Sequence, residues 1–429
     1  MPNINDYIKW RGDLELNVSE FNEIDSLILA RFSYLPFESL MKKEEELTIE
    51  ELSKRFEKAD KNKLEILWPD DSDLLPLLGQ SKRFGKMIAT DFLNKFDPEQ
   101  EKQFSAITVL LPDNTIFISY RGTDNTIIGW KEDFNMSFKS HIASQLDSVK
   151  YINDIAKKYQ NNIRIGGHSK GGNLAVYAAV FAAEEAKKRI INVYNNDGPG
   201  FADDITNTKE YKEMIEKVHT YIPQSSVIGR LLNHEEKYTV VKSIQKGIMQ
   251  HDLYSWQVQG TKVVSLKEVT NGSEFVDKTI KQWLDDVEPK QREIVIDTIF
   301  DILSTTEAES MIQIREKWFK NVGIMLKNYK NLDEDSKKMI GEIVRKLVIV
   351  AKSFISCKSI VYTIFTTVPI AAVAGNLPVI LDALEAPVDP PLPLLLTSNN
   401  SLTSDLEKPK SSINISSTTV SSVTEAYLS

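Results

Sequence analysis

The sequence has a single cysteine, Cys357, among its 429 residues. One thiol cannot form an intrachain disulfide, and it cannot supply a zinc site built on several cysteines. A secreted scaffold held together by disulfides is therefore excluded. Positive charge is also scarce, because 52 lysines and arginines stand against 61 aspartates and glutamates and give a formal net charge of -9. That balance argues against a nucleic-acid-binding surface, which needs clustered lysine and arginine.

Motifs for metals and cofactors are absent as well. The sequence contains no His-Glu-x-x-His pair, no phosphate-binding loop with its lysine, and no Gly-x-Gly-x-x-Gly at the start of a helix. We therefore expect no metal ion and no cofactor. Residues 1–16 carry charges throughout and lack the apolar run of about 7–15 residues that a secretory signal contains. This favours a cytoplasmic protein.

Long hydrophobic runs are limited to residues 359–381, which are uncharged and mostly apolar. The segment is long enough to cross a bilayer of about 30 Å, but Pro369, Pro378 and the Gly375–Asn376 pair would interrupt a helix there. We expect a buried or interfacial hairpin that does not span the bilayer but could bring the protein to a membrane surface. The tail at 397–429 is rich in serine and threonine, and we expect it to be disordered.

The middle of the chain alternates between short apolar strands and amphipathic helices. The runs AITVLL and TIFISY, separated by Pro112-Asp113-Asn114, predict a hairpin. Apolar runs at 163–165, 190–194 and 218–222, with helical patterns between them, predict parallel strands connected by helices. We therefore predict an α/β fold with a mostly parallel central sheet.

The regions on either side of this α/β part are predicted to be mainly helical. We divide the chain into a mainly helical N-terminal part of the main domain (1–100), an α/β core with the catalytic residues (101–270), a helical C-terminal region (271–357), an apolar and proline-rich segment (358–396) and the disordered tail (397–429).

The most informative motif is Gly167-His168-Ser169-Lys170-Gly171, a G-x-S-x-G sequence. It follows an apolar β-branched run and leads into a helix, which is the context of a nucleophile elbow. A serine at the tip of so tight a turn is strained, and its glycine neighbours make room for it. We predict that Ser169 is a nucleophile and that the backbone N–H of Lys170 faces an oxyanion. A glycine-rich turn with an incidental serine is the alternative.

A second motif, ISYRGTDNTIIGWKEDF, occupies residues 118–134. Thr123 follows a strand that ends at Tyr120, upstream of the nucleophile, where such hydrolases place a second oxyanion donor. We predict that Thr123 supplies this donor through its backbone N–H and hydroxyl. A plain hairpin turn is the alternative.

Together these motifs resemble those of the class 3 (fungal-type) lipases. FISYRGT…W…D and GGHSKGGNLA correspond to the family patterns FRGT…W…D and GHSLGGALA. The N-terminal segment and the later PQSSVIGRLL and QHDLYSWQV look more specifically like a bacterial lipase-like family of unassigned function, over roughly residues 1–260. The resemblance implies an α/β-hydrolase fold and hydrolysis of acyl esters. It does not identify the substrate, for which we expect only the class, a small-molecule or lipid acyl ester.

A serine nucleophile needs a base, and the chain has five histidines. In α/β hydrolases the histidine follows the nucleophile in the chain, which excludes His141. His168 lies inside the elbow, on the wrong side of the turn, and His219 and His234 fit ordinary structural or surface positions. His251 follows the last sheet-like run and matches the histidine motif of the family. We therefore assign the base to His251.

The acid of the triad departs from the family pattern. Class 3 lipases usually place an aspartate after the strand that precedes the histidine, but here that position holds Gln224, Ser225 and Ser226. Asp197 follows the previous strand, in VYNNDGPGF, a setting like that of the pancreatic-type lipases. We predict that Asp197 orients His251. A simple turn residue is the alternative, because the sequence around it is rich in turn formers.

The predicted function is that of a serine esterase. Ser169, His251 and Asp197 would form its triad. The same triad would also serve a thioesterase or a peptidase. The absent carboxylate at 224–226 and the apolar 359–381 segment leave open a non-catalytic binding or membrane-associated module that kept the fold.

Overall fold

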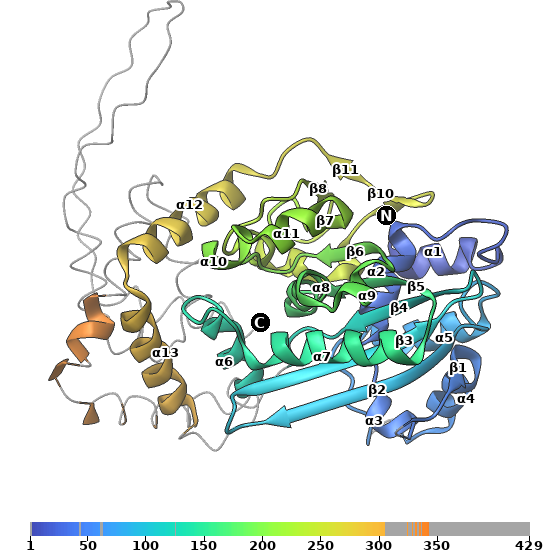
Figure 1. The fold of residues 1–429 in the computed structure, drawn as a ribbon, viewed down its shortest axis with the longest axis horizontal. Coiled ribbons are helices and arrows are strands. Elements are labelled where there is room, and N and C mark those ends of the chain that lie inside the picture. The colour runs from blue at the N-terminus through green and yellow to red at the C-terminus, as the bar shows by residue number, and fades with distance from the viewer. Residues whose placement is uncertain are drawn as a thin grey trace, which may run out of the picture. The chain divides into compact units, whose positions relative to one another are not determined.

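A nine-stranded mixed sheet forms the centre of the protein (Figure 1). The strands are β1 (Leu47–Thr48), β2 (Ile88–Asp97), β3 (Lys102–Leu110), β4 (Thr115–Tyr120), β5 (Asn162–His168), β6 (Ile190–Asn196), β7 (Val218–Pro223), β8 (Tyr238–Val241) and β11 (Ser265–Leu266), with β9 (Val258–Gln259) and β10 (Lys262–Val263) in a separate hairpin. Strands β4 to β8 are parallel, and the strands outside them pair antiparallel. This is the mostly parallel central sheet predicted from the sequence, arranged as in an α/β-hydrolase fold.

A computed structural model provides these coordinates. It describes residues 2–304, apart from 43, 61–62 and 125, and a few positions between 324 and 342. All described residues belong to one compact unit. The apolar segment at 359–381, the tail at 397–429 and Cys357 lie outside the described residues.

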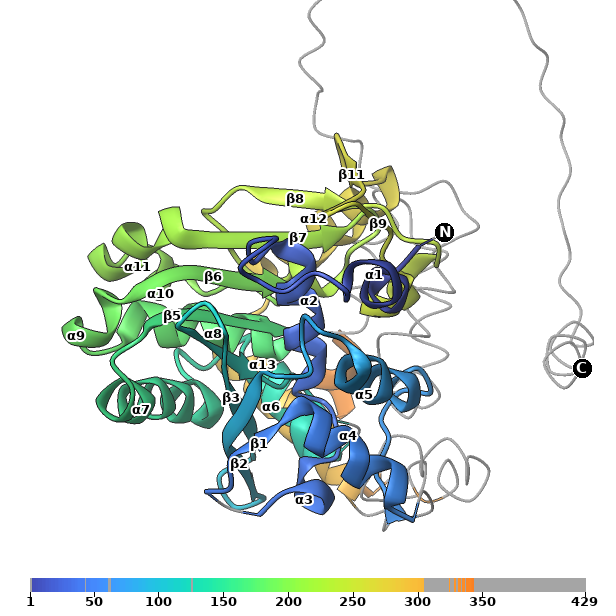
Figure 2. The same ribbon diagram turned by 90° about the vertical axis from the view of Figure 1, so that its right-hand side faces the viewer.

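Helices cover both faces of the sheet. The described helices are α1 (Ile4–Arg11), α2 (Glu23–Phe32), α3 (Phe37–Leu40), α4 (Ile49–Lys58), α5 (Asp71–Gln80), α6 (Ile127–Asn135), α7 (Ala143–Lys158), α8 (Lys170–Phe181), α9 (Glu184–Lys187), α10 (Asp203–Thr206), α11 (Lys209–Met214), α12 (Asn271–Asp286) and α13 (Pro289–Ser304). Figure 2 shows α2 on one side of the sheet and α7 and α8 on the other.

Two hydrophobic cores follow from this layering. Because side chains alternate along a strand, neighbouring residues of β4 serve different cores: Phe117 packs with the N-terminal helices, whereas Ile116 and Ile118 pack with α7 and α8. The N-terminal helices thus share their core with the sheet. A local sequence signal begins one of these helices, because Thr48 caps α4 through a capping box with Glu51.

The expected hairpin at Pro112-Asp113-Asn114 is confirmed, since β3 and β4 pair antiparallel across it. Two elements differ from expectation. β2 adds a ten-residue strand to a region expected to be mainly helical, because its burial is only partial and its polar residues mask the alternating pattern. The helical pattern between the strands at 163–165 and 190–194 divides into two helices, because α8 ends at Phe181 and a separate short helix, α9, follows it.

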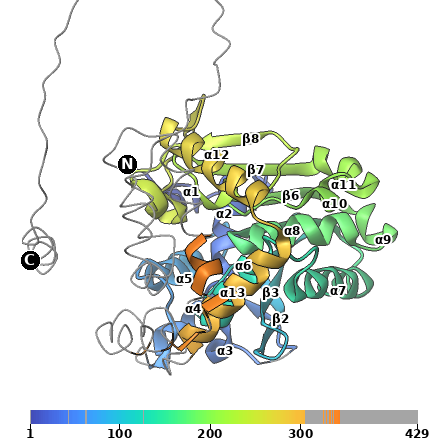
Figure 3. The ribbon, with the colours of Figure 1, turned by 90° about the vertical axis from the view of Figure 1, so that its left-hand side faces the viewer.

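The C-terminal helices extend the domain beyond the sheet. Pro289 occupies the first position of α13, where proline is favoured because an N–H group at that position would have no partner inside the helix. Figure 3 shows α13 beside α6, where the Phe134 and Phe300 rings lie 5.8 Å apart and Lys131 pairs with Asp297 at 2.9 Å. Within the described part of the chain, no helix combines the length and apolar character that crossing a bilayer requires.

Candidate active site

Ser169 lies at the sharp turn between β5 and α8. Its backbone has φ 58° and ψ -134°, a conformation that non-glycine residues rarely adopt. Gly167 and Gly171 make the turn fit: a Cβ on Gly167 would lie 2.2 Å from Gly171, and one on Gly171 would lie 2.1 Å from the Tyr120 carbonyl at the end of β4. The strand–turn–helix context expected of a nucleophile elbow is therefore present, with a half-buried serine at its tip.

His251 and Asp197 are in direct contact. His251 ends the 3₁₀ helix at Gly247–His251, and its Nδ1 lies 2.7 Å from Asp197 Oδ2. Asp197 directly follows β6, has φ 52° and is 1% exposed. The structure thus brings together the base and the acid that the sequence analysis assigned.

The other carboxylate oxygen of Asp197, Oδ1, accepts hydrogen bonds from the segment that follows β7, in which residues 224–226 include no carboxylate. Ser226 Oγ donates to Asp197 Oδ1 at 2.5 Å, and the Gly229 N–H donates to the same oxygen at 3.1 Å. The position after β7, where class 3 lipases usually carry the acid, therefore contributes a hydroxyl that orients an acid from β6. Sequence reasoning placed Ser226 in a polar stretch but did not foresee this role.

His168 supports His251 from the elbow. Its Nε2 lies 2.7 Å from the His251 carbonyl, and the two rings lie 4.4 Å apart. Burial, together with the neighbouring His251, holds the pKa of His168 well below its ordinary range, so the ring is neutral. Because a carbonyl only accepts, Nε2 carries the proton and Nδ1 is an acceptor, which the Tyr34 hydroxyl faces at 3.2 Å while it also lies 3.1 Å from the His168 carbonyl. No sequence pattern pointed to Tyr34.

The remaining histidines lie elsewhere. His141 contacts the Tyr177 hydroxyl, His219 contacts Asn192, and His234 pairs with Glu236. No hydrogen bond within the described residues involves the Ser169 hydroxyl.

Thr123 and Lys170 lie on two segments that meet at the elbow. A Cβ on Gly122 would lie 3.1 Å from Ser169 Cβ and 2.5 Å from the His168 carbonyl, so the loop before Thr123 packs directly on the turn. Lys170 occupies the first position of α8, where N–H groups have no partner inside the helix. Among the described residues, no hydrogen bond uses the N–H of Thr123 or of Lys170. Both donors are available.

Asp133 connects the Thr123 loop to α6. The Thr123 hydroxyl donates a short hydrogen bond to Asp133 Oδ2, so the prediction that this hydroxyl would serve an oxyanion was wrong, and only the backbone N–H remains for that role. Burial raises the pKa of Asp133 to about 6, although Lys170 and the Thr123 hydroxyl act in the opposite direction. The aspartate belongs to the W…D part of the motif, but no sequence pattern indicated its partner.

We expect Asp133→Asn to gain thermal stability relative to the wild type as pH rises. The carboxyl is protonated in both folded and unfolded chains well below its unfolded pKa of 3.8, whereas above about pH 6 its ionised form must be kept in a half-buried site. The wild type therefore loses stability between about pH 4 and 6, and the amide, which does not titrate, does not. Thermal unfolding of both proteins by circular dichroism from about pH 4 to 8 measures this, and a constant difference in Tm would contradict it.

Three solved structures are similar to this chain. A Rhizomucor miehei lipase–propeptide complex shares 15% identity over 36% of this chain and 56% of its own, with a TM-score of 0.29. A fungal lipase–inhibitor complex shares 18% over 33% and 60%, with a TM-score of 0.25. M37 lipase shares 16% over 48% and 69%, with a TM-score of 0.31. The chain thus spans less than two thirds of the length of the first two.

Among curated proteins, none matches this sequence. A family model described as Mbeg1-like matches residues 78–301. The matched region contains Thr123, Ser169, Lys170, Asp197 and His251. The match confirms the lipase-like family that the motifs indicated. Because it covers more than half of the sequence, the chain belongs to the Mbeg1-like family.

Proposed function

We propose that the protein is a serine hydrolase that cleaves acyl esters through a covalent acyl-enzyme. Ser169 is the nucleophile, His251 the general base and then acid, and Asp197 the group that orients the imidazole. The observation that carries the proposal is the 2.7 Å contact between His251 Nδ1 and Asp197 Oδ2. It leaves Nε2 as the proton acceptor of the same ring, beside an elbow whose serine hydroxyl has no hydrogen-bond partner among the described residues.

The chemistry then follows in two balanced halves. Ser169 Oγ attacks the ester carbonyl while its proton passes to His251 Nε2, and Asp197 stabilises the imidazolium through Nδ1. His251 returns the proton to the departing alcohol, which leaves an acyl-serine. In the second half, water attacks the acyl-serine while its proton passes to His251 Nε2. His251 then returns that proton to Ser169 Oγ, and the carboxylic acid is released. In both halves the charged carbonyl oxygen would accept from the backbone N–H groups of Thr123 and Lys170.

A fluorophosphonate probe tests the proposal directly, because it reacts with activated serines only. We expect the purified full-length protein to gain the mass of one phosphonyl group on the peptide that contains Ser169. Ser169→Ala should gain none. Absence of labelling in the folded wild type would contradict the proposal and favour a non-catalytic module.

A small-molecule or lipid ester is the substrate class that this proposal names, and a series of p-nitrophenyl esters of increasing chain length would define the acyl group. Thioesters and peptide bonds can be offered to the same preparation, because the triad itself does not discriminate among acyl donors. A cytoplasmic location, with contact to a membrane surface through residues 359–381, also belongs to the proposal.

A further inference from the structure

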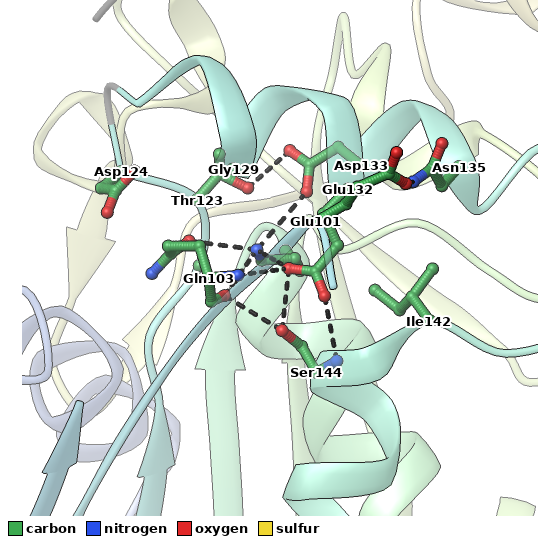
Figure 4. A network of polar contacts seen from close by, with 12 residues as sticks. Glu101, Gln103, Thr123, Asp124, Gly129, Glu132, Asp133, Asn135, Ile142 and Ser144 are labelled. Carbon is green, nitrogen blue, oxygen red and sulfur yellow. Dashed lines mark hydrogen bonds and ion pairs between the residues drawn. The ribbon is translucent and has the colours of Figure 1, made fainter. Parts of the chain in front are cut away.

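A buried ion pair joins Lys170 to Glu132. Figure 4 shows the polar contacts around Glu132 and those between Asp133 and Thr123. Lys170 Nζ lies 2.9 Å from Glu132 Oε2, with the two side chains 0% and 1% exposed. The remaining hydrogens of the ammonium group go to the Gln103 carbonyl at 2.9 Å and to Gln103 Oε1 at 3.0 Å. All three hydrogens of the ammonium group therefore have acceptors.

Glu132 is equally well satisfied. Its Oε2 also accepts from the Gln103 N–H at 3.0 Å and from the Ser144 hydroxyl at 2.8 Å, and its Oε1 accepts from the Ser144 N–H at 2.9 Å. Because these residues lie on β3, α6, α7 and α8, one cluster joins four elements. Although burial alone would lower the pKa of Lys170, the Glu132 and Asp133 carboxylates hold it above its ordinary range, so the lysine stays charged.

The cluster reaches both oxyanion donors. Lys170 carries one donor on its own backbone, and its side chain is bound to α6 through Glu132. The next residue of α6, Asp133, accepts from the hydroxyl of Thr123, which carries the second donor, and lies 3.9 Å from Lys170 Nζ. One ammonium group thus connects the start of α8 with the helix that holds the Thr123 loop.

Packing alone does not require this arrangement. An apolar side chain would fill the site without the desolvation cost of two buried charges, and the class 3 pattern GHSLGGALA has leucine at this position. Here the ammonium group of Lys170 and the carboxylate of Glu132 have all their hydrogen-bond partners, and such directional contacts favour one geometry. Oxyanion donors need such fixation, because they work only when they are aimed at the charged oxygen before it forms.

We infer that Lys170 is a positioning residue, whose side chain, through Glu132, holds the Thr123 and Lys170 N–H groups at the spacing that an oxyanion requires. The inference rests on the proposed function, because it assigns a role within that site. It predicts an effect on the transition state and none on substrate binding in the ground state.

The test uses the neutral double variant Lys170→Met/Glu132→Gln in the full-length protein. Removing both charges avoids leaving one of them unpaired in the interior, which would endanger folding. We expect kcat for a short-chain p-nitrophenyl ester to fall about 10- to 100-fold with KM nearly unchanged, because misplaced donors weaken only the transition state. The affinity for a trifluoromethyl ketone, which forms an oxyanion with Ser169, should fall by a similar factor.

A second buried pair provides the matched control. Arg83 and Asp25 are both 0% exposed and contact none of the proposed site residues. The variant Arg83→Met/Asp25→Asn removes a comparable ion pair, so it should lower the Tm while leaving kcat and the ketone affinity near their wild-type values. This separates positioning from a general loss of stability.

The outcomes distinguish the two proposals. If the wild type neither hydrolyses esters nor reacts with the fluorophosphonate, the proposed function fails, and this inference fails with it. If the wild type is active and the folded Lys170→Met/Glu132→Gln variant keeps its kcat and ketone affinity, only the role of Lys170 is overturned. Equal losses of kcat in the site variant and in the Arg83→Met/Asp25→Asn control would also overturn it.

Discussion

Ser169→Ala is expected to lower kcat for a short-chain p-nitrophenyl ester by about 10⁶-fold, the size of effect seen when a serine hydrolase loses its nucleophile. Without the hydroxyl, no acyl-enzyme can form, and any residual rate comes from substrate binding and the oxyanion donors. The fold should be unaffected, because no hydrogen bond within the described residues depends on that hydroxyl. We therefore expect an ester-hydrolysis assay to detect almost no turnover by Ser169→Ala, while its circular dichroism spectrum matches that of the wild type.

His251→Ala should have an effect of the same order, and the double variant Ser169→Ala/His251→Ala should be no slower than either single variant. Members of a triad act as one unit, so the first loss removes most of what the second could remove. His141→Ala serves as the control, because that side chain contacts Tyr177 and none of the proposed triad. Additive losses in the double variant would show that the two residues act independently and would contradict the triad.

The sequence predicted the parts of this site that depend on local backbone geometry. The glycines around Ser169 are required by the contacts of Gly167 and Gly171 with each other and with the end of β4, and such requirements are visible as a fixed spacing. The order of strands and helices around them followed from hydrophobic periodicity. The position of Asp197 followed from its place directly after a parallel strand, since the carboxyl ends of parallel strands meet at one edge of the sheet.

The parts that the sequence did not reveal depend on contacts between distant segments. Tyr34 reaches His168 from the N-terminal region, and Ser226 reaches Asp197 from the loop after β7. The two residues of each pair lie far apart in the sequence, so no local motif predicts their contact. Glu132 was hidden for another reason, because a charged residue beside a tryptophan on a short amphipathic helix usually faces solvent, and its partner Lys170 was noticed only for its backbone.

Asp197→Asn is expected to lower kcat by about 10⁴-fold while the protein stays folded. The direction follows from the hydrogen bonds that surround the carboxylate. The Gly229 N–H can only donate, and it points at Oδ1 together with the Ser226 hydroxyl. These donors would hold the amide oxygen of the asparagine on their side.

The amide NH₂ group would then face His251 Nδ1 and force that nitrogen to act as an acceptor. The proton would move to Nε2, which could no longer take the proton of Ser169. Asp252→Asn is the matched control: Asp252 Oδ1 accepts from the Tyr254 N–H at 3.0 Å, an asparagine can do the same, and turnover should change little. The test of whether Asp197 orients His251 is ester hydrolysis by the two variants, with their folding checked by circular dichroism. Near-wild-type turnover in folded Asp197→Asn would show that the imidazole does not depend on this carboxylate and would leave a serine–histidine pair as the catalytic unit.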